Sequence, residues 1–231
     1  AFLDVPSPPQ PSVPDDFPPL PPPPPRSPAL RVVETAFLAS TAALIWILSY
    51  TPLAPFMRLF FPIPVALAVM RWDPRTGAMA LVVSALLLTV LMGPTRSILY
   101  VIPYGLLGYG CARLWQQRFS WYVSVASGAA LSAFGLVFQL LLSSLLVGEN
   151  LWTYVTIQLT GLTNWLLDVS LARLGVYWVA EPWMVQVVVV AFIAFNSLIY
   201  VFTVHLVAAL VMEHFRCPLP PPPKWVQFLL D

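Results

Sequence analysis

Charged residues are scarce in this chain of 231 residues, since Asp, Glu, Lys and Arg together make up only 9% of it. A formal net charge of +1 and the lack of a dense basic run argue against a nucleic-acid partner. The two cysteines, Cys111 and Cys217, are too few for a disulfide framework and lack metal-ligand spacing. We therefore expect two free thiols, no bound metal and no cofactor.

The sequence also lacks the motifs of the common enzyme classes. It contains no G-x-S-x-G, no H-E-x-x-H and no phosphate-binding P-loop. Its two histidines, His205 and His214, fall on different levels of one predicted helix. The residue pairs usual for intramembrane proteolysis and redox-cofactor ligation are missing. We therefore expect that the protein is not an enzyme.

Apolar residues, in contrast, are abundant. They make up 59% of the chain, and the mean hydropathy is +0.80, whereas a globular protein has about 45–50% apolar residues. The few charges lie between apolar stretches long enough to cross a bilayer. A charge at the bilayer centre costs about 2.5–3.5 kcal/mol, so charges are confined to the edges. This distribution predicts an all-α, polytopic transmembrane helical bundle, solvated by membrane lipid.

The breaks between apolar stretches predict about six membrane spans. Prolines inside the second and fourth spans predict kinks, which a membrane bundle tolerates when neighbouring groups bond the freed carbonyls. The stretch 151–180 is amphipathic, which favours an interface or a cavity wall over a lipid-surrounded span. The expected spans are 32–50, 57–70, 76–92, 97–112, 121–147 and 183–212.

The distribution of arginine and lysine favours six crossings over seven. With six crossings and 151–180 outside, eight of these cations lie on the inner side and three on the outer side. A seventh crossing through 151–168 would change the numbers to seven and four. Because inner loops are enriched in Lys and Arg, both termini are expected on the inner side.

The two ends of the chain differ in composition from the bundle, which we expect at 31–215. Residues 1–30 are rich in proline and predict an extramembrane arm in polyproline II conformation. This arm is either a solvated tail or a docking segment for a partner subunit. Residues 216–231 combine a proline-rich hinge with Trp225 and apolar residues, which predicts an interfacial anchor.

Two predicted spans carry small residues at a spacing of three or four, which places them on one helical face. Such faces allow close helix packing in lipid, either within the bundle or toward another membrane subunit. The residues are Ala36, Ala39 and Ala43 in the first span, and Ser124, Gly128 and Ser132 in the fifth.

Polar residues within or beside the spans suggest a ligand-binding site. Arg58 and Arg96 lie on the outer side, against the inner preference of cations, and Arg96 follows a Gly-Pro turn. Our hypothesis is an outward-facing pocket for a polar or anionic small molecule. The alternative is that the arginines pair with carboxylates or snorkel, and that the other residues form interhelical hydrogen bonds. The candidates are Arg58, Arg96, Thr160, Asn164, Asp168, Asn196 and Tyr200.

Several stretches resemble a family of multi-pass membrane proteins of unknown function, the YybS-like family, in its cyanobacterial and chloroplast branch. This family is similar in architecture to the substrate-binding S components of energy-coupling-factor vitamin transporters. The resemblance implies six helices, cytoplasmic termini, an outward-opening pocket, and a small-residue face on the first helix that meets a coupling subunit. Ala39 and Ala43 match that face. The stretches are 34–41, 58–67, 91–99, 204–207 and 222–227.

Two functions remain open from the sequence. The first is an S-type, substrate-binding component of a small-molecule importer, which would need separate coupling subunits. The second is a non-transporting assembly or structural factor of a photosynthetic membrane complex. The resemblance implies the plasma or thylakoid membrane of a cyanobacterium or chloroplast.

Overall fold

The computed structural model describes residues 27–52, 54–171, 181–215, 217 and 223, and every regular element among them is a helix. Most of the expected proline-rich arm, and nearly all of the expected hinge and anchor at 216–231, lie outside these residues. The first helix begins at Pro28, slightly before the expected boundary at 31. The Ser27 hydroxyl oxygen accepts from the Leu30 amide (3.2 Å), and the proline at the first helical position has no N–H that would need a partner.

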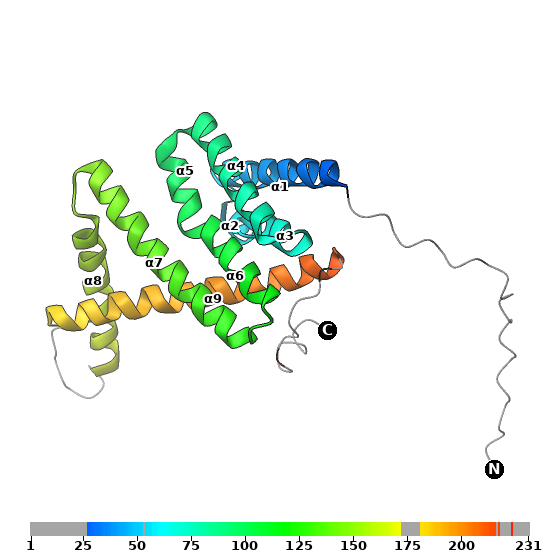
Figure 1. The fold of residues 1–231 in the computed structure, drawn as a ribbon. Helices are drawn as coiled ribbons and strands as arrows, with labels where there is room; N and C mark the ends of the chain where they lie inside the picture. The colour runs from blue at the N-terminus through cyan, green and yellow to red at the C-terminus, as the bar shows by residue number, and fades with distance from the viewer. Residues whose placement is uncertain (1–26, 53, 172–180, 216, 218–222, 224–231) are drawn as a thin grey trace, which may run out of the picture.

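Four helices in the described residues are long and apolar enough to cross a membrane (Figure 1). Their lengths are 21, 19, 27 and 33 residues. At a rise of about 1.5 Å per residue, even the shortest is about 28 Å long, close to the thickness of the hydrocarbon layer. They are α1 (Pro28–Leu48), α4 (Pro74–Met92), α7 (Trp121–Val147) and α9 (Pro182–His214).

The second and fourth expected spans are each broken into shorter helices, as their prolines predict. Pro62 separates the first pair, and the backbone leaves helical geometry at Ile102, immediately before Pro103 (φ −112°, ψ 112°). The six expected crossings are therefore not established, because neither broken segment contains a single helix of spanning length. The pieces are α2 (Ala54–Phe60) and α3 (Ile63–Arg71), then α5 (Pro94–Tyr100), the π-helical turn η1 (Val101–Gly105) and α6 (Leu106–Gln116).

The broken segments form the centre of the bundle. Every residue from Phe61 to Val69 is buried, so α3 is enclosed on all sides by α1, α4 and α6. Glycines allow the close approach: a Cβ on Gly108 of α6 would overlap the carbonyl oxygen of Pro62, and one on Gly135 of α7 would overlap the ring of Pro103. Each proline break is thus matched by a glycine on the neighbouring helix.

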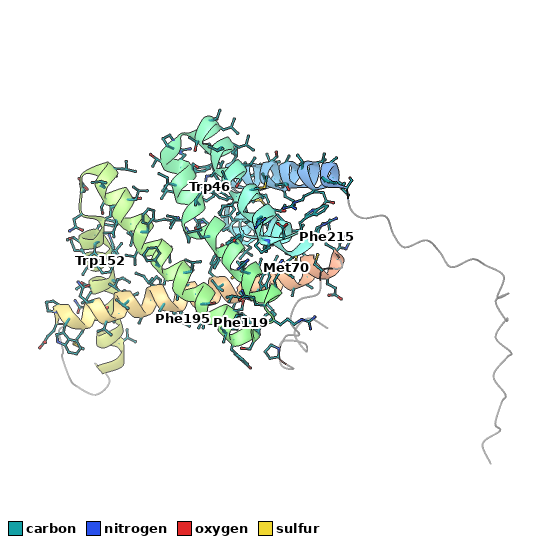
Figure 2. The ribbon with its side chains drawn as sticks, viewed as in Figure 1. Trp46, Met70, Phe119, Trp152, Phe195 and Phe215 are labelled. Atoms are coloured by element: carbon teal, nitrogen blue, oxygen red, sulfur yellow. The ribbon has the colours of Figure 1, made fainter. Side chains whose placement is uncertain are left out.

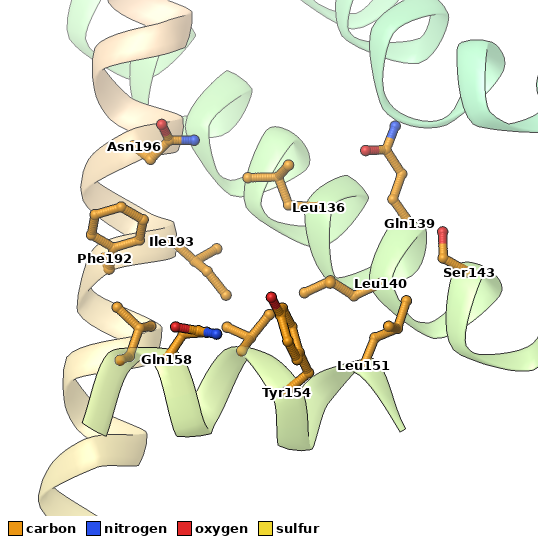
Figure 3. Close-up of a pocket in the computed structure, with 12 residues that line it drawn as sticks. Leu136, Gln139, Leu140, Ser143, Leu151, Tyr154, Gln158, Phe192, Ile193 and Asn196 are labelled. Carbon is orange, nitrogen blue, oxygen red and sulfur yellow. The ribbon is translucent and has the colours of Figure 1, made fainter. Parts of the chain in front are cut away.

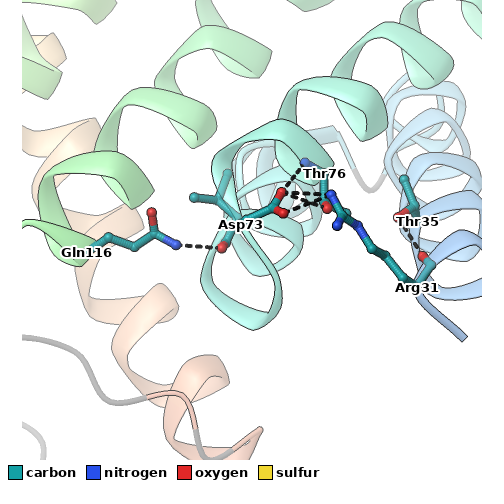
Figure 4. A network of polar contacts seen from close by, with 6 residues as sticks. Arg31, Thr35, Asp73, Thr76 and Gln116 are labelled. Carbon is teal, nitrogen blue, oxygen red and sulfur yellow. Dashed lines mark hydrogen bonds and ion pairs between the residues drawn. The ribbon is translucent and has the colours of Figure 1, made fainter. Parts of the chain in front are cut away.

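Ion pairs, a hydrogen bond and a cation–π contact bring four segments together at one end of the bundle, which we call the α1 N-terminal end. Arg31 pairs with Asp73 (2.8 Å), and Arg71 pairs with Glu34 (2.8 Å). The Gln116 side-chain amide donates to the Val69 carbonyl (2.7 Å), which adds the end of α6 (Figure 4). The Arg71 guanidinium lies over the ring of Phe215, 5.9 Å from its centroid, which adds the end of α9.

Asp73 caps the first turn of α4 at this end. Its carboxylate accepts from the Thr76 amide (2.6 Å) and the Thr76 hydroxyl (2.8 Å). The hydrogen bond from the Thr76 amide is the main reason that the pKa of Asp73 lies below its usual value of 3.8, and Arg31 and Arg75 contribute in the same direction. Partial burial raises the pKa but does not outweigh these interactions.

A pH-dependent stability follows from this cap. Since the folded-state pKa is lower than the unfolded one, the ionised carboxylate stabilises the fold above the unfolded pKa, and this contribution disappears as the pH falls through the folded pKa. We expect Asp73→Asn to lower the thermal midpoint at pH 7, and the difference from the parent protein to shrink below pH 3.8. Thermal unfolding in detergent across this range is the measurement. A difference that stays constant with pH would contradict the assignment.

The small-residue faces lie mostly inside the bundle. Ala39 and Ala43 are buried where α1 packs on α3 and α4, whereas Ala36 is exposed. On α7, Ser124, Gly128 and Ser132 are buried, and α7 makes its most extensive contact with α9. Bulky apolar side chains also project from the outer surface, among them Phe195 and Phe119 (Figure 2). This is the pattern of a protein solvated by lipid.

α8 (Leu151–Leu171) is the amphipathic helix expected within 151–180. It is not among the spanning helices found in the described residues. It begins where the Leu151 amide donates to the Ser144 hydroxyl (2.9 Å), and it contacts both α7 and α9. α8 therefore closes one side of the space between those two helices.

Candidate functional site

A cavity of about 600 Å³ lies between α7, α8 and α9. Figure 3 shows α8 lying across the opening between the other two helices, with side chains from all three pointing into the cavity. The lining is mainly aliphatic, and Phe192 and Tyr154 contribute aromatic rings. The aliphatic residues are Leu136, Leu140, Leu151, Val155, Leu159 and Ile193.

Among the residues that the structure describes around this cavity, the polar groups are all uncharged. Gln139 and Ser143 come from α7, Gln158 comes from α8, and Asn196 comes from α9. Gln139 is held in place because its side-chain amide donates to the Leu99 carbonyl (3.1 Å) at the end of α5. Amides offer donors and acceptors without a net charge. The cavity thus suits an amphiphilic molecule with a few hydrogen-bonding groups.

The two candidate arginines lie elsewhere, around an aromatic cluster of Trp46, Tyr50, Phe61, Tyr104 and Tyr200. The Arg96 guanidinium lies over the ring of Tyr50, 4.6 Å from its centroid. The Tyr200 hydroxyl donates to the backbone carbonyl of Arg58 (2.9 Å). The rings contact one another in series, with centroids 4.9–6.2 Å apart. Both arginine side chains are exposed, and neither lines the cavity.

The remaining site candidates are distributed along α8 and α9. Asn196 lines the cavity, one turn before Tyr200 on α9. Thr160 is half-buried and donates its hydroxyl proton to the Thr156 carbonyl (2.8 Å). Asn164 is half-buried on the same helix, and the side chain of Asp168 lies outside the described part of the chain. The structure therefore brings Arg58, Arg96 and Tyr200 to one cluster and Asn196 to a separate cavity.

A buried polar pair joins α7 and α9. The Ser124 hydroxyl oxygen lies 2.8 Å from Nε2 of His205, and Nδ1 of His205 lies 2.9 Å from the Val201 carbonyl oxygen. Because a carbonyl can only accept, Nδ1 carries the proton and Nε2 accepts from Ser124. The imidazole lies edge-on to Trp115 (5.2 Å) and Trp121 (5.4 Å). Both members are fully buried, so the pair acts as an interhelical hydrogen bond.

The sequence predicts a helix-packing role for Ser124 and does not identify a partner for His205. The face of small residues on α7, which favoured the packing role, is also the face that contacts α9. Cys111 and Cys217 are both buried. Across the described ranges, no three His, Cys, Asp or Glu side chains lie close enough to hold a metal ion.

Comparison with known proteins supports the membrane assignment. No curated protein and no solved structure matches this chain. Residues 39–230 match a family described as "Predicted membrane protein (DUF2232)", and this match includes the aromatic cluster, the cavity and the Ser124–His205 pair. Since the match covers most of the sequence, the chain belongs to this family of predicted membrane proteins.

Proposed function

We propose that this protein is an S-type, substrate-binding component of a small-molecule importer, with its ligand held between α7, α8 and α9. The observation that supports the proposal is the cavity of about 600 Å³ with a mainly apolar wall and a few amide groups. Binding sites for small molecules are commonly concave, mostly apolar and about 300–1,000 Å³ in volume.

The described residues that line this cavity include no charged side chain, and this indicates the chemistry of the ligand. A charged ligand would be desolvated there without a counter-charge, which is costly. We therefore propose an uncharged amphiphilic ligand, hydrogen-bonded by Gln139, Gln158 and Asn196. This changes the expected preference for an anion, because Arg58 and Arg96 do not line the cavity.

Import would require partner subunits, because the sequence has no P-loop of its own. Since Ala39 and Ala43 are buried inside the bundle, we propose that a coupling subunit contacts the exposed face of α1 that carries Val33, Phe37 and Leu44. In this proposal the two broken segments also cross the membrane, which gives six crossings and puts both termini on the cytoplasmic side. The membrane would be the plasma or thylakoid membrane of a cyanobacterium or chloroplast.

Purification of the full chain in mild detergent, followed by mass spectrometry of co-purifying small molecules, tests the proposal. We expect the parent protein to retain an amphiphile, and Leu140→Trp, which fills the cavity from α7, to reduce its amount at least about tenfold. Leu145→Trp is the matched control, because Leu145 lies on the same helix, is 80% exposed and does not line the cavity. Equal retention by both variants would refute binding at this place.

The alternative is an assembly or structural factor of a photosynthetic membrane complex. A groove of about 540 Å³ between α7 and α9 favours it, because the described residues that line it include no amide or charged side chain. Trp121, Val125 and Phe202 are among the residues that line this groove, which suits an apolar partner surface. Photosynthetic subunits in the same purification, without a retained small molecule, would favour this function over import.

A further inference from the structure

A third hollow, of about 330 Å³, follows the seam between α6 and α7. On α6 its lining includes Gly110, Leu114 and Gln117, and on α7 it includes Ser127 and Leu131. A Cβ on Gly110 would lie 3.7 Å from Leu131, so these two residues are level with each other across the seam. We call this hollow the α6–α7 groove.

One end of the α6–α7 groove is cationic. Arg113, which also lines the groove, is half-buried in the last turn of α6. It makes no ion pair with any residue that the structure describes. Neither α6 nor α7 contains an acidic residue, and the turn between them carries only a further cation, Arg118. The groove thus contains a positive charge without a counter-charge on the elements that form it.

The other end of the groove is apolar and extends into the bundle. Gln117 and Gly110 are two turns apart on α6, a distance of about 10 Å along the helix axis. Gly110 leaves this part open, because it has no side chain. The apolar side chains of Leu114 and Leu131 suit contact with a hydrocarbon chain.

The charged end lies at the α1 N-terminal end of the bundle, because Gln116 bonds to Val69 there. Arg31, Arg71 and Arg75 belong to the same end, and such a concentration of cations marks the cytoplasmic side of a membrane protein. The cytoplasmic leaflet carries anionic lipids, and basic pockets between transmembrane helices on that side bind their headgroups.

From this arrangement we infer that the α6–α7 groove binds one anionic phospholipid. Its phosphate lies against Arg113, and the first part of one acyl chain lies along the apolar surface of Leu114 and Leu131. The site is separate from the cavity between α7, α8 and α9, so it does not depend on the proposed importer function.

Native mass spectrometry of the full-length protein, with phosphatidylglycerol and phosphatidylcholine of identical chains in equal amounts, tests the inference. We expect the parent protein to retain phosphatidylglycerol in preference to phosphatidylcholine. Arg113→Gln should weaken binding of phosphatidylglycerol about fivefold and remove the preference. Gly110→Leu, which places a side chain in the apolar part, should weaken binding of both lipids by a similar factor.

Two variants serve as controls. Gly110→Ala adds only a Cβ in ordinary contact with Leu131, and Arg75→Gln removes an exposed cation at the same end of the bundle that does not line the groove. Both should bind phosphatidylglycerol like the parent protein, and thermal unfolding checks that all four variants fold. If Arg113 only stabilised the end of α6, no variant would change lipid binding, and the inference would be overturned. An equal loss in Arg75→Gln and Arg113→Gln would overturn it as well, because diffuse surface charge would then explain the preference.

Discussion

Replacing His205 by alanine should lower the free energy of unfolding by about 3 kcal/mol, the lower end of the range for truncating a large buried aromatic side chain. The imidazole is fully buried between Trp115 and Trp121, so its removal leaves a cavity that the two rigid rings cannot easily fill. It also leaves the Ser124 hydroxyl without its acceptor. The cavity and the lost hydrogen bond both act at the contact between α7 and α9.

Chemical unfolding of the detergent-solubilised protein, followed by tryptophan fluorescence, is the measurement. Ser124→Ala should cost only about 1 kcal/mol, since interhelical hydrogen bonds in membrane proteins contribute about that much. The double variant should cost less than the sum, because the bond between Ser124 and His205 can be lost only once. A variant His205→Ala as stable as the parent protein would show that the pair does not hold α7 against α9.

Gly108→Ala should destabilise the fold by about 2–3 kcal/mol, the cost expected of overpacking a tight interior. The added methyl group would overlap the Pro62 carbonyl oxygen, which belongs to the backbone and cannot rotate away. Helix α6 would have to move off the α2–α3 segment at the centre of the bundle. At a helix position with free space around it, replacing glycine by alanine normally stabilises the helix by up to about 1 kcal/mol.

Gly161→Ala is the matched control for this substitution. Gly161 also lies within a helix, α8, but nothing lies within 4 Å of the position that its Cβ would take. We expect this variant to be at least as stable as the parent protein in the same unfolding experiment. Equal effects of the two substitutions would mean that the close approach of Gly108 to Pro62 does not support the fold.

The sequence predicts the positions of the helices well, because apolar length and proline position have direct physical consequences. The spans expected at 76–92 and 121–147 correspond to α4 and α7, with nearly the same bounds. Pro62 and Pro103 break their segments as expected. In contrast, the sequence does not establish whether these broken segments cross the membrane. Neither contains a continuous helix of spanning length, so their position depends on the helices packed around them.

The grouping of polar residues was harder to predict. Arg58 and Arg96 were expected with Asn196 around one pocket, yet Arg96 stacks on Tyr50 and Asn196 lines a separate cavity. Helical periodicity predicts on which face of its own helix a residue lies. It does not predict which other helix packs against that face. The contact between Ser124 and His205 shows the same limit, because residues 81 positions apart are brought together only by the packing of α7 on α9.

The length of α9 has a consequence for access to the cavity. A helix of 33 residues is about 50 Å long, some 20 Å more than the hydrocarbon layer that it would cross. In the proposed topology, with Glu213 at the inner boundary of that layer, Asn196 lies about 25 Å along the axis, close to the outer boundary. The turns before Phe192 then rise beyond the acyl chains, and α8 rests against this raised part. With this topology, a water-borne molecule would meet the mouth of the cavity at the headgroups, without first dissolving in the bilayer.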